Sequence, residues 1–225
     1  GGLDLGVMAG LAAHLPFDEG SRARLAKHAP RGKVFDLKLE WTASAAELSA
    51  LQKWTVSSRF EGLGLSALGP VPGMAGVNGR VDGNEKGGTL VLDGQKAVFE
   101  LPTIFADPKL ELEAFAAEAD WRLANDGLQV RLQKAAFHNR DAAGEASGTW
   151  RPLEKGPGQI DLQARITRGS GDAVWRYMPL VVGKNVREWL REAIIGGKAS
   201  DTTLKLRGDL WNFPFRDGKD GIFEV

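Results

Sequence analysis

The sequence predicts a mainly β protein, an antiparallel sheet accompanied by a few short helices. Apolar and polar residues alternate in many short segments, and turn residues separate these segments at intervals of about 8–12 residues. Glycine accounts for 29 of the 225 residues, roughly twice the usual ~7%. Seven Trp residues accompany a single Tyr, which also favours strands. A chain of this length can bury a sizeable core as one large domain or two small ones.

Residues 1–32 predict a helical lead-in to the sheet. Apolar residues from Leu3 to Ala13 recur at helical spacing, and Pro16 ends that pattern. Asp18 can cap a second short helix, which we expect to continue to about His28.

Residues 33–168 predict a β-meander. From Lys33 to Trp41 apolar side chains alternate with charged ones, as in a half-buried strand. Residues 44–52 have helix propensity, so we expect a short excursion or loop there. Asp93-Gly94 is the type of pair that forms a hairpin turn. The further strand segments are Trp54–Phe60, Val77–Val81, Thr89–Leu92, Ala97–Leu101, Lys109–Leu112, Glu118–Leu123, Leu128–Leu132, Ala135–His138, Ala143–Trp150 and Gln159–Ile166.

Residues 169–197 predict a helical insertion, and residues 198–225 predict resumed strands. In the segment Val186–Ile195 an apolar helical face includes Trp189, Leu190 and Ile194. We expect this face to pack on the sheet, either as a helix that covers or gates part of it or as an ordinary core helix. Strands resume at Thr203–Leu210 and Gly221–Val225.

The residue counts argue against several classes of function. Lys plus Arg and Asp plus Glu are both 29, so the chain lacks the basic excess of a nucleic-acid-binding surface. The absence of Cys excludes disulfides, zinc–thiolate sites and a cysteine nucleophile. His14, His28 and His138 have no metal-ligand spacing. We therefore expect no catalytic residue, no metal and no cofactor.

No apolar run approaches the ~20 residues that span a bilayer, and no signal peptide is recognisable. The chain begins Gly-Gly-Leu without an initiator Met. We expect it to be an internal piece of a longer protein, with any membrane anchor outside it.

The most prominent remaining feature is one-sided apolar character along the strands. This face packs in a closed core or lines a groove for an apolar ligand, and periodicity alone does not separate these two interpretations. Trp54 and Trp121 fall on this face. The candidate groove-lining residues are Phe35, Leu37, Leu39, Trp41, Val56, Phe60, Leu90, Leu92, Phe99, Leu101, Leu123, Leu128, Val130, Leu132, Ile160, Leu162, Leu204 and Leu206.

Two segments near the C-terminus resemble the YhdP branch of the AsmA-like envelope proteins. The first is Trp175-Arg-Tyr-Met-Pro-Leu followed by Val186-Arg-Glu-Trp-Leu-Arg-Glu-Ala-Ile-Ile-Gly-Gly. The second is Leu206-Arg-Gly-Asp-Leu-Trp-Asn-Phe-Pro-Phe. Upstream, Phe60-Glu-Gly-Leu-Gly-Leu and Pro72-Gly-Met-Ala-Gly-Val-Asn-Gly keep the order of elements in that branch. The resemblance covers nearly the whole chain.

The resemblance implies an elongated, strongly curved antiparallel sheet that forms a U-shaped, taco-like groove, as in chorein-type bridge proteins. It implies a periplasmic section of an inner-membrane-anchored protein in a Gram-negative bacterium. The expected cargo is phospholipid, held by its acyl chains, and the expected role is support of the outer-membrane permeability barrier. The expected partners are the rest of the same long chain and other envelope proteins. No nucleic acid is expected.

Two alternatives stay open at this point. One is a structural or interaction segment of the cell envelope, with a closed core and no lipid path. The other is a carbohydrate-active enzyme on a β-sandwich, which would need two facing carboxylates. An open apolar groove would favour transport over both alternatives.

Overall fold

The computed structural model describes the chain apart from residues 1, 12–18, 45–46, 70, 126 and 216–219. The predicted helix cap at Asp18, the helix stop at Pro16 and His14 lie outside the described residues.

The described strands form one antiparallel sheet, in which neighbours in sequence are neighbours in space. The sheet order is β1 through β9, then β11 and β12, and β10 pairs with β9. This order confirms the predicted meander. The strands are β1 (Leu3–Asp4), β2 (Arg31–Ser44), β3 (Glu47–Leu65), β4 (Gly73–Asn84), β5 (Gly87–Glu100), β6 (Lys109–Ala124), β7 (Gly127–His138), β8 (Ala142–Arg151), β9 (Gln159–Ser170), β10 (Lys198–Ala199), β11 (Thr202–Asp209) and β12 (Gly221–Glu224).

The described helices are short and lie near the two ends of the sheet. Helices α1 (Leu5–Leu11) and α2 (Glu19–His28) precede β2. Three further helical segments follow β9: the 3-10 helices η2 (Gly171–Tyr177) and η3 (Leu180–Val182) and the α-helix α3 (Lys184–Ala193). A last 3-10 turn, η4 (Leu210–Asn212), follows β11.

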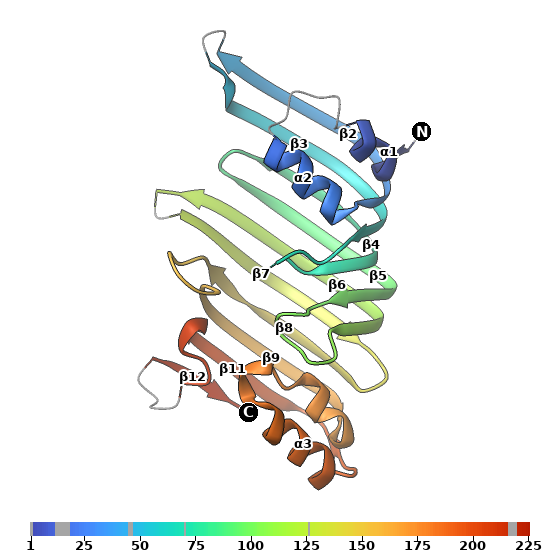
Figure 1. Ribbon diagram of the computed structural model, residues 1–225, viewed down its shortest axis with the longest axis vertical. Helices are drawn as coiled ribbons and strands as arrows, with labels where there is room; N and C mark the ends of the chain where they lie inside the picture. The colour runs from blue at the N-terminus through green and yellow to red at the C-terminus, as the bar shows by residue number, and fades with distance from the viewer. Residues whose placement is uncertain (1, 12–18, 45–46, 70, 126, 216–219) are drawn as a thin grey trace.

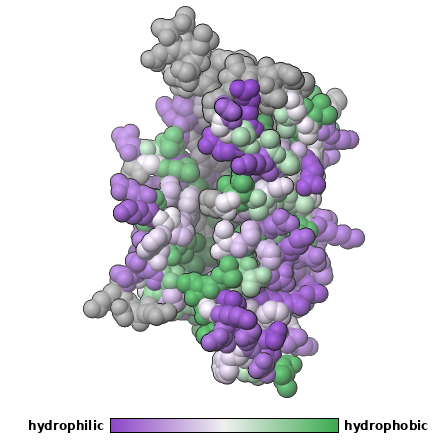
Figure 2. Space-filling view, viewed as in Figure 1, coloured by the Kyte–Doolittle hydropathy of each residue, from purple (hydrophilic) through white to green (hydrophobic). Residues whose placement is uncertain are grey.

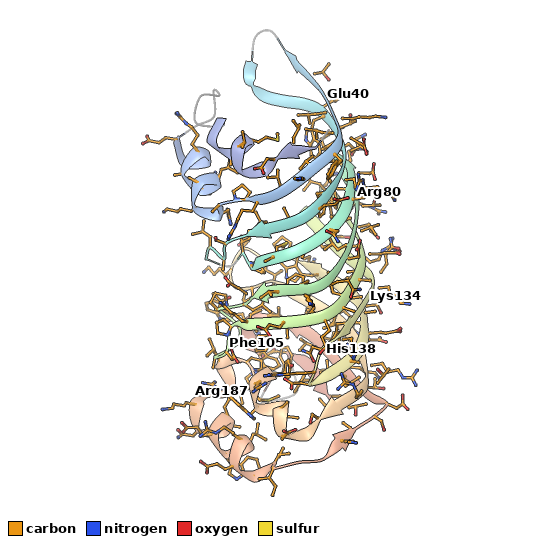
Figure 3. The ribbon with its side chains drawn as sticks, turned by 90° about the vertical axis from the view of Figure 1, so that its right-hand side faces the viewer. Glu40, Arg80, Phe105, Lys134, His138 and Arg187 are labelled. Carbon is orange, nitrogen blue, oxygen red and sulfur yellow. The ribbon has the colours of Figure 1, made fainter. Side chains whose placement is uncertain are left out.

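The strands stack along the long axis of the molecule (Figure 1). Turned by 90°, the sheet is bowed, with one concave and one convex face (Figure 3). The labelled side chains of Glu40, Arg80 and Lys134 lie on the convex side, and those of Phe105 and Arg187 lie on the concave side. The molecule is therefore an open, curled sheet that forms a groove, as the family resemblance implied.

The sheet does not fold onto a second layer. The chain has 14892 Å² of accessible surface, whereas a compact protein of 24.2 kDa would expose about 10,000 Å². Among the described residues, the buried hydrophobic cluster is limited to Phe60, Val77 and Ala97, with half-buried neighbours around it. Most of the apolar side chains are therefore held by their neighbours in one sheet and not by a closed core.

Two segments differ from the sequence prediction. Residues 44 and 47–52 of the predicted excursion are strand, and Ser44 pairs with Glu47 and Ala43 with Leu51 where β2 and β3 meet. Asp93-Gly94 forms no turn and lies inside β5, where the two residues pair with Ala116 and Phe115. In both cases pairing with a neighbouring strand outweighs the local preference. For the same reason β5, β6 and β7 each join two of the predicted strand segments.

Candidate functional site

The backbone pairing assigns residues to the two faces of the sheet, because directly paired residues of antiparallel strands share a face. One row is almost entirely apolar: Leu206, Leu162, Gly148, Leu132, Ala119, Leu90, Val81 and Ser58. The adjacent row is polar: Arg207, Asp161, Thr149, Arg131, Asp120, Thr89, Asp82 and Ser57. We call these faces the inner and the outer face, respectively. Arg80 is two residues from Asp82 of the outer row, and Lys134 pairs with Glu118, two residues from Asp120 of that row. Both side chains lie on the convex side (Figure 3), so the inner face is the concave one.

The inner face is neither buried nor fully exposed. Along β9 the inner residues Ile160, Leu162, Ala164 and Ile166 are half-buried, whereas the outer residues that alternate with them are exposed. Other inner residues are more exposed: the exposed fraction is 53% for Leu39 and 56% for Leu123. Hydrophobic side chains gather along a hollow down the middle of this face, flanked by hydrophilic ones (Figure 2). The inner face therefore presents a continuous apolar surface that a ligand can reach.

Aromatic rings lie flat on this surface because glycines face them. Trp121 on β6 is in register with Gly88 on β5, which is in register with Gly83 on β4. A Cβ atom on Gly83 would lie 2.7 Å from Cζ2 of Trp121, too close for a side chain. Phe137 lies in the same way over Gly144, where a Cβ atom would be 3.2 Å from the ring. The high glycine content, which predicted turns, thus also lets the aromatic rings lie close to the backbone of the sheet.

The outer face carries a ladder of exposed ion pairs. Arg80 Nε lies 3.1 Å from Asp82 Oδ2, and Arg207 Nε lies 3.6 Å from Asp161 Oδ2. Arg131 Nε donates a hydrogen bond of 2.9 Å to Asp120 Oδ1. This bond, followed by one from the Gln133 side-chain amide, holds the pKa of Asp120 below its usual value. Paired charges of this kind suit a face in contact with water.

The structure brings most of the predicted lining residues together. Strand pairing places on the inner face Leu39, Val56, Phe60, Leu90, Leu92, Leu123, Leu128, Val130, Leu132, Ile160, Leu162, Leu204 and Leu206. Leu37 alternates in step with Leu39, and Leu101 is a half-buried residue just beyond β5. The ring of Phe99 packs edge-on against Phe115, 5.1 Å between centroids. Trp41 pairs with Trp54 through its backbone, and its side chain lies outside the described part of the structure.

Phe35 is the exception to this arrangement. It pairs with Arg59 of the outer face, and the Arg59 guanidinium lies 4.4 Å from the centre of its ring. The register of β2 shifts between Phe35 and Lys38, where Asp36 has a φ of 53°. A bulge of this kind turns the residues on either side of it to opposite faces. Strict alternation therefore assigned Phe35 to the wrong face, and the sequence carries no clear signal for the bulge.

Several further inner-face residues were not predicted from the sequence. Pairing places Phe115, Phe137 and Trp150 in the inner row, together with the facing glycines. Alternation along β7 contained the signal for Phe137, which follows Ala135 by two residues. The glycines gave no such signal, because a residue without a side chain has no apolar pattern.

Helix α3 packs differently from the prediction. Its main contacts are with η2 and η3. Leu190 and Ile194 are half-buried, and a Cβ atom on Gly171 would be 3.3 Å from Ile194. Trp189, which was expected to pack on the sheet, is 64% exposed. The predicted role of this helix as a cover or gate stays a prediction.

A second hollow, of about 630 Å³, lies where the β5–β6 and β7–β8 connections meet η2. Its polar network joins Asn139, Asp141 and Tyr177: Asn139 Nδ2 donates to Tyr177 Oη at 2.9 Å, and Tyr177 Oη donates to Asp141 Oδ2 at 3.1 Å. Burial raises the pKa of Tyr177. The lining mixes cations and carboxylates in equal number, and its hydrogen bonds tie the β7–β8 turn to η2.

Other arrangements of chemical interest are limited in the described part of the chain. No three His, Asp or Glu side chains converge there as metal ligands would. His138 Nδ1 lies 2.9 Å from Glu113 Oε2, and both side chains are about half exposed. None of the described helices combines the length and apolar composition needed to cross a bilayer.

Comparison with known proteins links this geometry to a family. The family model described as "YhdP protein" matches residues 1–225. The chain is 28% identical over 199 residues to a protein of Escherichia coli (strain K12) named "Intermembrane phospholipid transporter YhdP". That alignment covers 87% of this chain and 15% of the relative, so the chain spans only a small part of the relative's length. No solved structure matches.

Proposed function

Because the chain belongs to the YhdP protein family, we propose that its curled sheet is one section of a bridge that carries phospholipids between two membranes. The acyl chains lie on the apolar inner face, and the headgroups stay in water along the open side of the groove. The observation that carries this proposal is the almost entirely apolar row across eight strands, partly open to solvent and backed by a polar outer face.

The dimensions support a path longer than a single lipid. Neighbouring strands are about 4.8 Å apart, so the eleven strands in the main order of the sheet extend roughly 48 Å. An acyl chain is about half as long as the ~30 Å hydrocarbon core of a bilayer. The groove can therefore hold lipids one after another along its length.

The energetics also support a path along which lipids slide. Burying a methylene group is worth ~0.8 kcal/mol, so complete enclosure of a 16-carbon chain would contribute roughly 13 kcal/mol. A groove that is open on one side would contribute about half of that free energy. Because the inner face is apolar along its length, a chain that moves by one strand exchanges one set of contacts for an equivalent set.

The name of the E. coli relative supports a location between the two membranes of a Gram-negative envelope. There the chain would be a periplasmic section of a protein anchored in the inner membrane. It would supply lipids that maintain the outer-membrane barrier. The open inner face speaks against the closed-core structural segment, and the solvated outer carboxylates give no support to a glycosidase.

Site-specific photocrosslinking in cells tests the proposal. A photoreactive residue is placed in the intact protein at Val130 or Leu162 on the inner face, with matched controls at Gln129 or Asp161 on the outer face. We expect phospholipid adducts from the two inner positions and few from the outer ones. Equal labelling of both faces, or no inner labelling in a correctly folded protein, would contradict a lipid path on this face.

A further inference from the structure

A basic pocket lies beside the groove, where the β5–β6 connection meets helix α3. Its volume is about 220 Å³, and its walls come from three segments: residues 106–107, η2 and α3. The β5–β6 connection is fixed to η3 by the bridge between Phe105 and Pro179 and by a 2.8 Å hydrogen bond from Leu180 N to the carbonyl oxygen of Ile104. The pocket is therefore built from chain segments far apart in sequence.

The charge of this pocket differs from that of the chain as a whole. Its lining contains the four cations Arg176, Lys184, Arg187 and Arg191 and the two carboxylates Asp107 and Glu188. Because Arg176 pairs with Asp141 outside this lining and Lys184 pairs with Glu188, the charges left in the pocket are Arg187, Arg191 and Asp107, an excess of one positive charge, whereas the chain is neutral. A local excess of this kind attracts anions.

Two of these cations are already neutralised. Arg176 Nη1 lies 3.2 Å from Asp141 Oδ2, and Lys184 Nζ lies 3.5 Å from Glu188 Oε1. No carboxylate of the described residues pairs with Arg187 or Arg191. Arg187 uses one N–H, which donates to the carbonyl oxygen of Leu180 at 3.1 Å. Its remaining donors, and those of Arg191, are available to a ligand.

Trp175 orients two of the guanidinium groups. Arg176 Cζ lies 5.6 Å and Arg191 Cζ lies 5.8 Å from the centre of its half-buried ring. Stacking on an aromatic face fixes the plane of a guanidinium and leaves its edge free to donate hydrogen bonds. A planar fork of donors matches the oxygens of a phosphate better than a lysine ammonium does.

The position of the pocket connects it with the groove. Phe105 and Arg187 lie on the concave side of the sheet, away from the charged convex face (Figure 3). The pocket therefore lies on the same side of the sheet as the apolar inner face.

We propose that Arg187 and Arg191, the latter stacked on Trp175, form a binding site for the phosphate group of a phospholipid at the rim of the groove. This inference rests on the proposed function and adds a headgroup contact to it. A lipid that slides on apolar contacts alone has no preferred stopping place. The site supplies one position along the groove at which the phosphate is held.

Binding of a short-chain phosphatidylglycerol to the intact protein, below its micellar concentration, tests this site. Inorganic phosphate and a short-chain diacylglycerol without phosphate serve as comparison ligands. We expect the double variant Arg187→Gln/Arg191→Gln to weaken phosphatidylglycerol binding by about tenfold or more, the effect of removing charge-assisted hydrogen bonds. Diacylglycerol binding should not change.

Two further variants control for charge and for folding. Arg80→Gln removes one exposed arginine from the convex face and should leave phosphatidylglycerol binding unchanged. Arg191→Lys keeps the charge but loses the planar fork, and should weaken binding by a smaller factor than Arg191→Gln. Melting temperatures near that of the unchanged protein establish that each variant is folded.

Equal phosphatidylglycerol affinity of the unchanged protein and a folded double variant would overturn the proposal. Binding of inorganic phosphate without binding of the lipid would also overturn it, because the site would then take free phosphate. The proposed function has a separate readout, the inner-face crosslinks at Val130 and Leu162. If these crosslinks persist while the double variant binds lipid normally, the groove stands and the headgroup site falls.

Discussion

The indole ring of Trp121 reaches across one strand and lies against the backbone of Gly83. A Cβ atom on Gly83 would lie only 2.7 Å from ring atom Cζ2. Gly88 lies between the two in register and is covered by the same ring. Although tryptophan has the largest side chain, the Trp121 ring therefore protrudes little into the groove.

Gly83→Ala is expected to lift the Trp121 ring off the sheet and narrow the groove. Overpacking of this kind costs about 1–3 kcal/mol, to be measured by chemical denaturation. Lipid crosslinking from Val130, which pairs with Trp121, should fall at the same time. Gly196→Ala is the matched control, because no atom lies within 4 Å of a Cβ built there. Unchanged stability and crosslinking in Gly83→Ala would mean that the ring is not held against this glycine.

Charge on the inner face should block lipid without unfolding the sheet. Leu37, Leu39 and Val130 are exposed or half-buried, so an aspartate there can stay hydrated in the empty protein but must be desolvated beside an acyl chain. We expect Leu37→Asp, Leu39→Asp and Val130→Asp each to reduce lipid crosslinking in the intact protein, and Thr149→Asp on the outer face to leave it unchanged. Crosslinking that survives all three substitutions in folded protein would remove these positions from the lipid path.

The two sides of α3 should differ in their contribution to stability. Trp189 is 64% exposed, so Trp189→Ala is expected to change the free energy of unfolding by less than about 0.5 kcal/mol. Leu190 is half-buried against its neighbours, and Leu190→Ala should cost more, about 1–2 kcal/mol, below the range for fully buried leucines. Thermal melting of both variants provides the comparison. A large loss in Trp189→Ala alone would show that the ring packs in a core.

The stability contributed by Asp120 should depend on pH. The hydrogen bond from Arg131, followed by that from Gln133, holds the folded-state pKa of Asp120 below its usual value. The ionised carboxyl therefore stabilises the fold above pH about 4, and this contribution is lost as the pH falls through the folded-state pKa. Asp120→Asn should lower the free energy of unfolding at pH 7 by less than about 1 kcal/mol. Denaturation at decreasing pH should show the difference shrinking below pH about 4, and a constant difference would argue against the stabilised carboxylate.

The isolated 225-residue chain should associate with itself as its concentration rises. No described strand pairs with the outer edge of β12, and Phe223 and Val225 are exposed there, at 45% and 77%. Unpaired strand edges with apolar side chains invite pairing with another chain. Light scattering over a dilution series should detect larger species, and Ile222→Lys should reduce them. A monomer at every concentration would show that this edge is already protected.

Sequence periodicity by itself determined the meander and most of the inner face. Alternation with period two is a local property, and residues such as Leu128, Val130 and Leu132 fall on one side of any extended strand. The continuity of the strands was not a local property. At Asp93-Gly94 and in residues 47–52, pairing with a neighbouring strand decided the outcome against the turn and helix preferences.

The tertiary structure alone decided what covers each apolar side chain. The bulge at Asp36 moved Phe35 to the outer face, and packing against η2 left Trp189 in solvent. The Arg187–Arg191 pocket arises only where the β5–β6 connection meets α3, some eighty residues apart in sequence. A strand pattern states which residues share a face. Whether that face becomes a core or an open groove depends on the surface packed against it, and here the described sheet curls without a second layer.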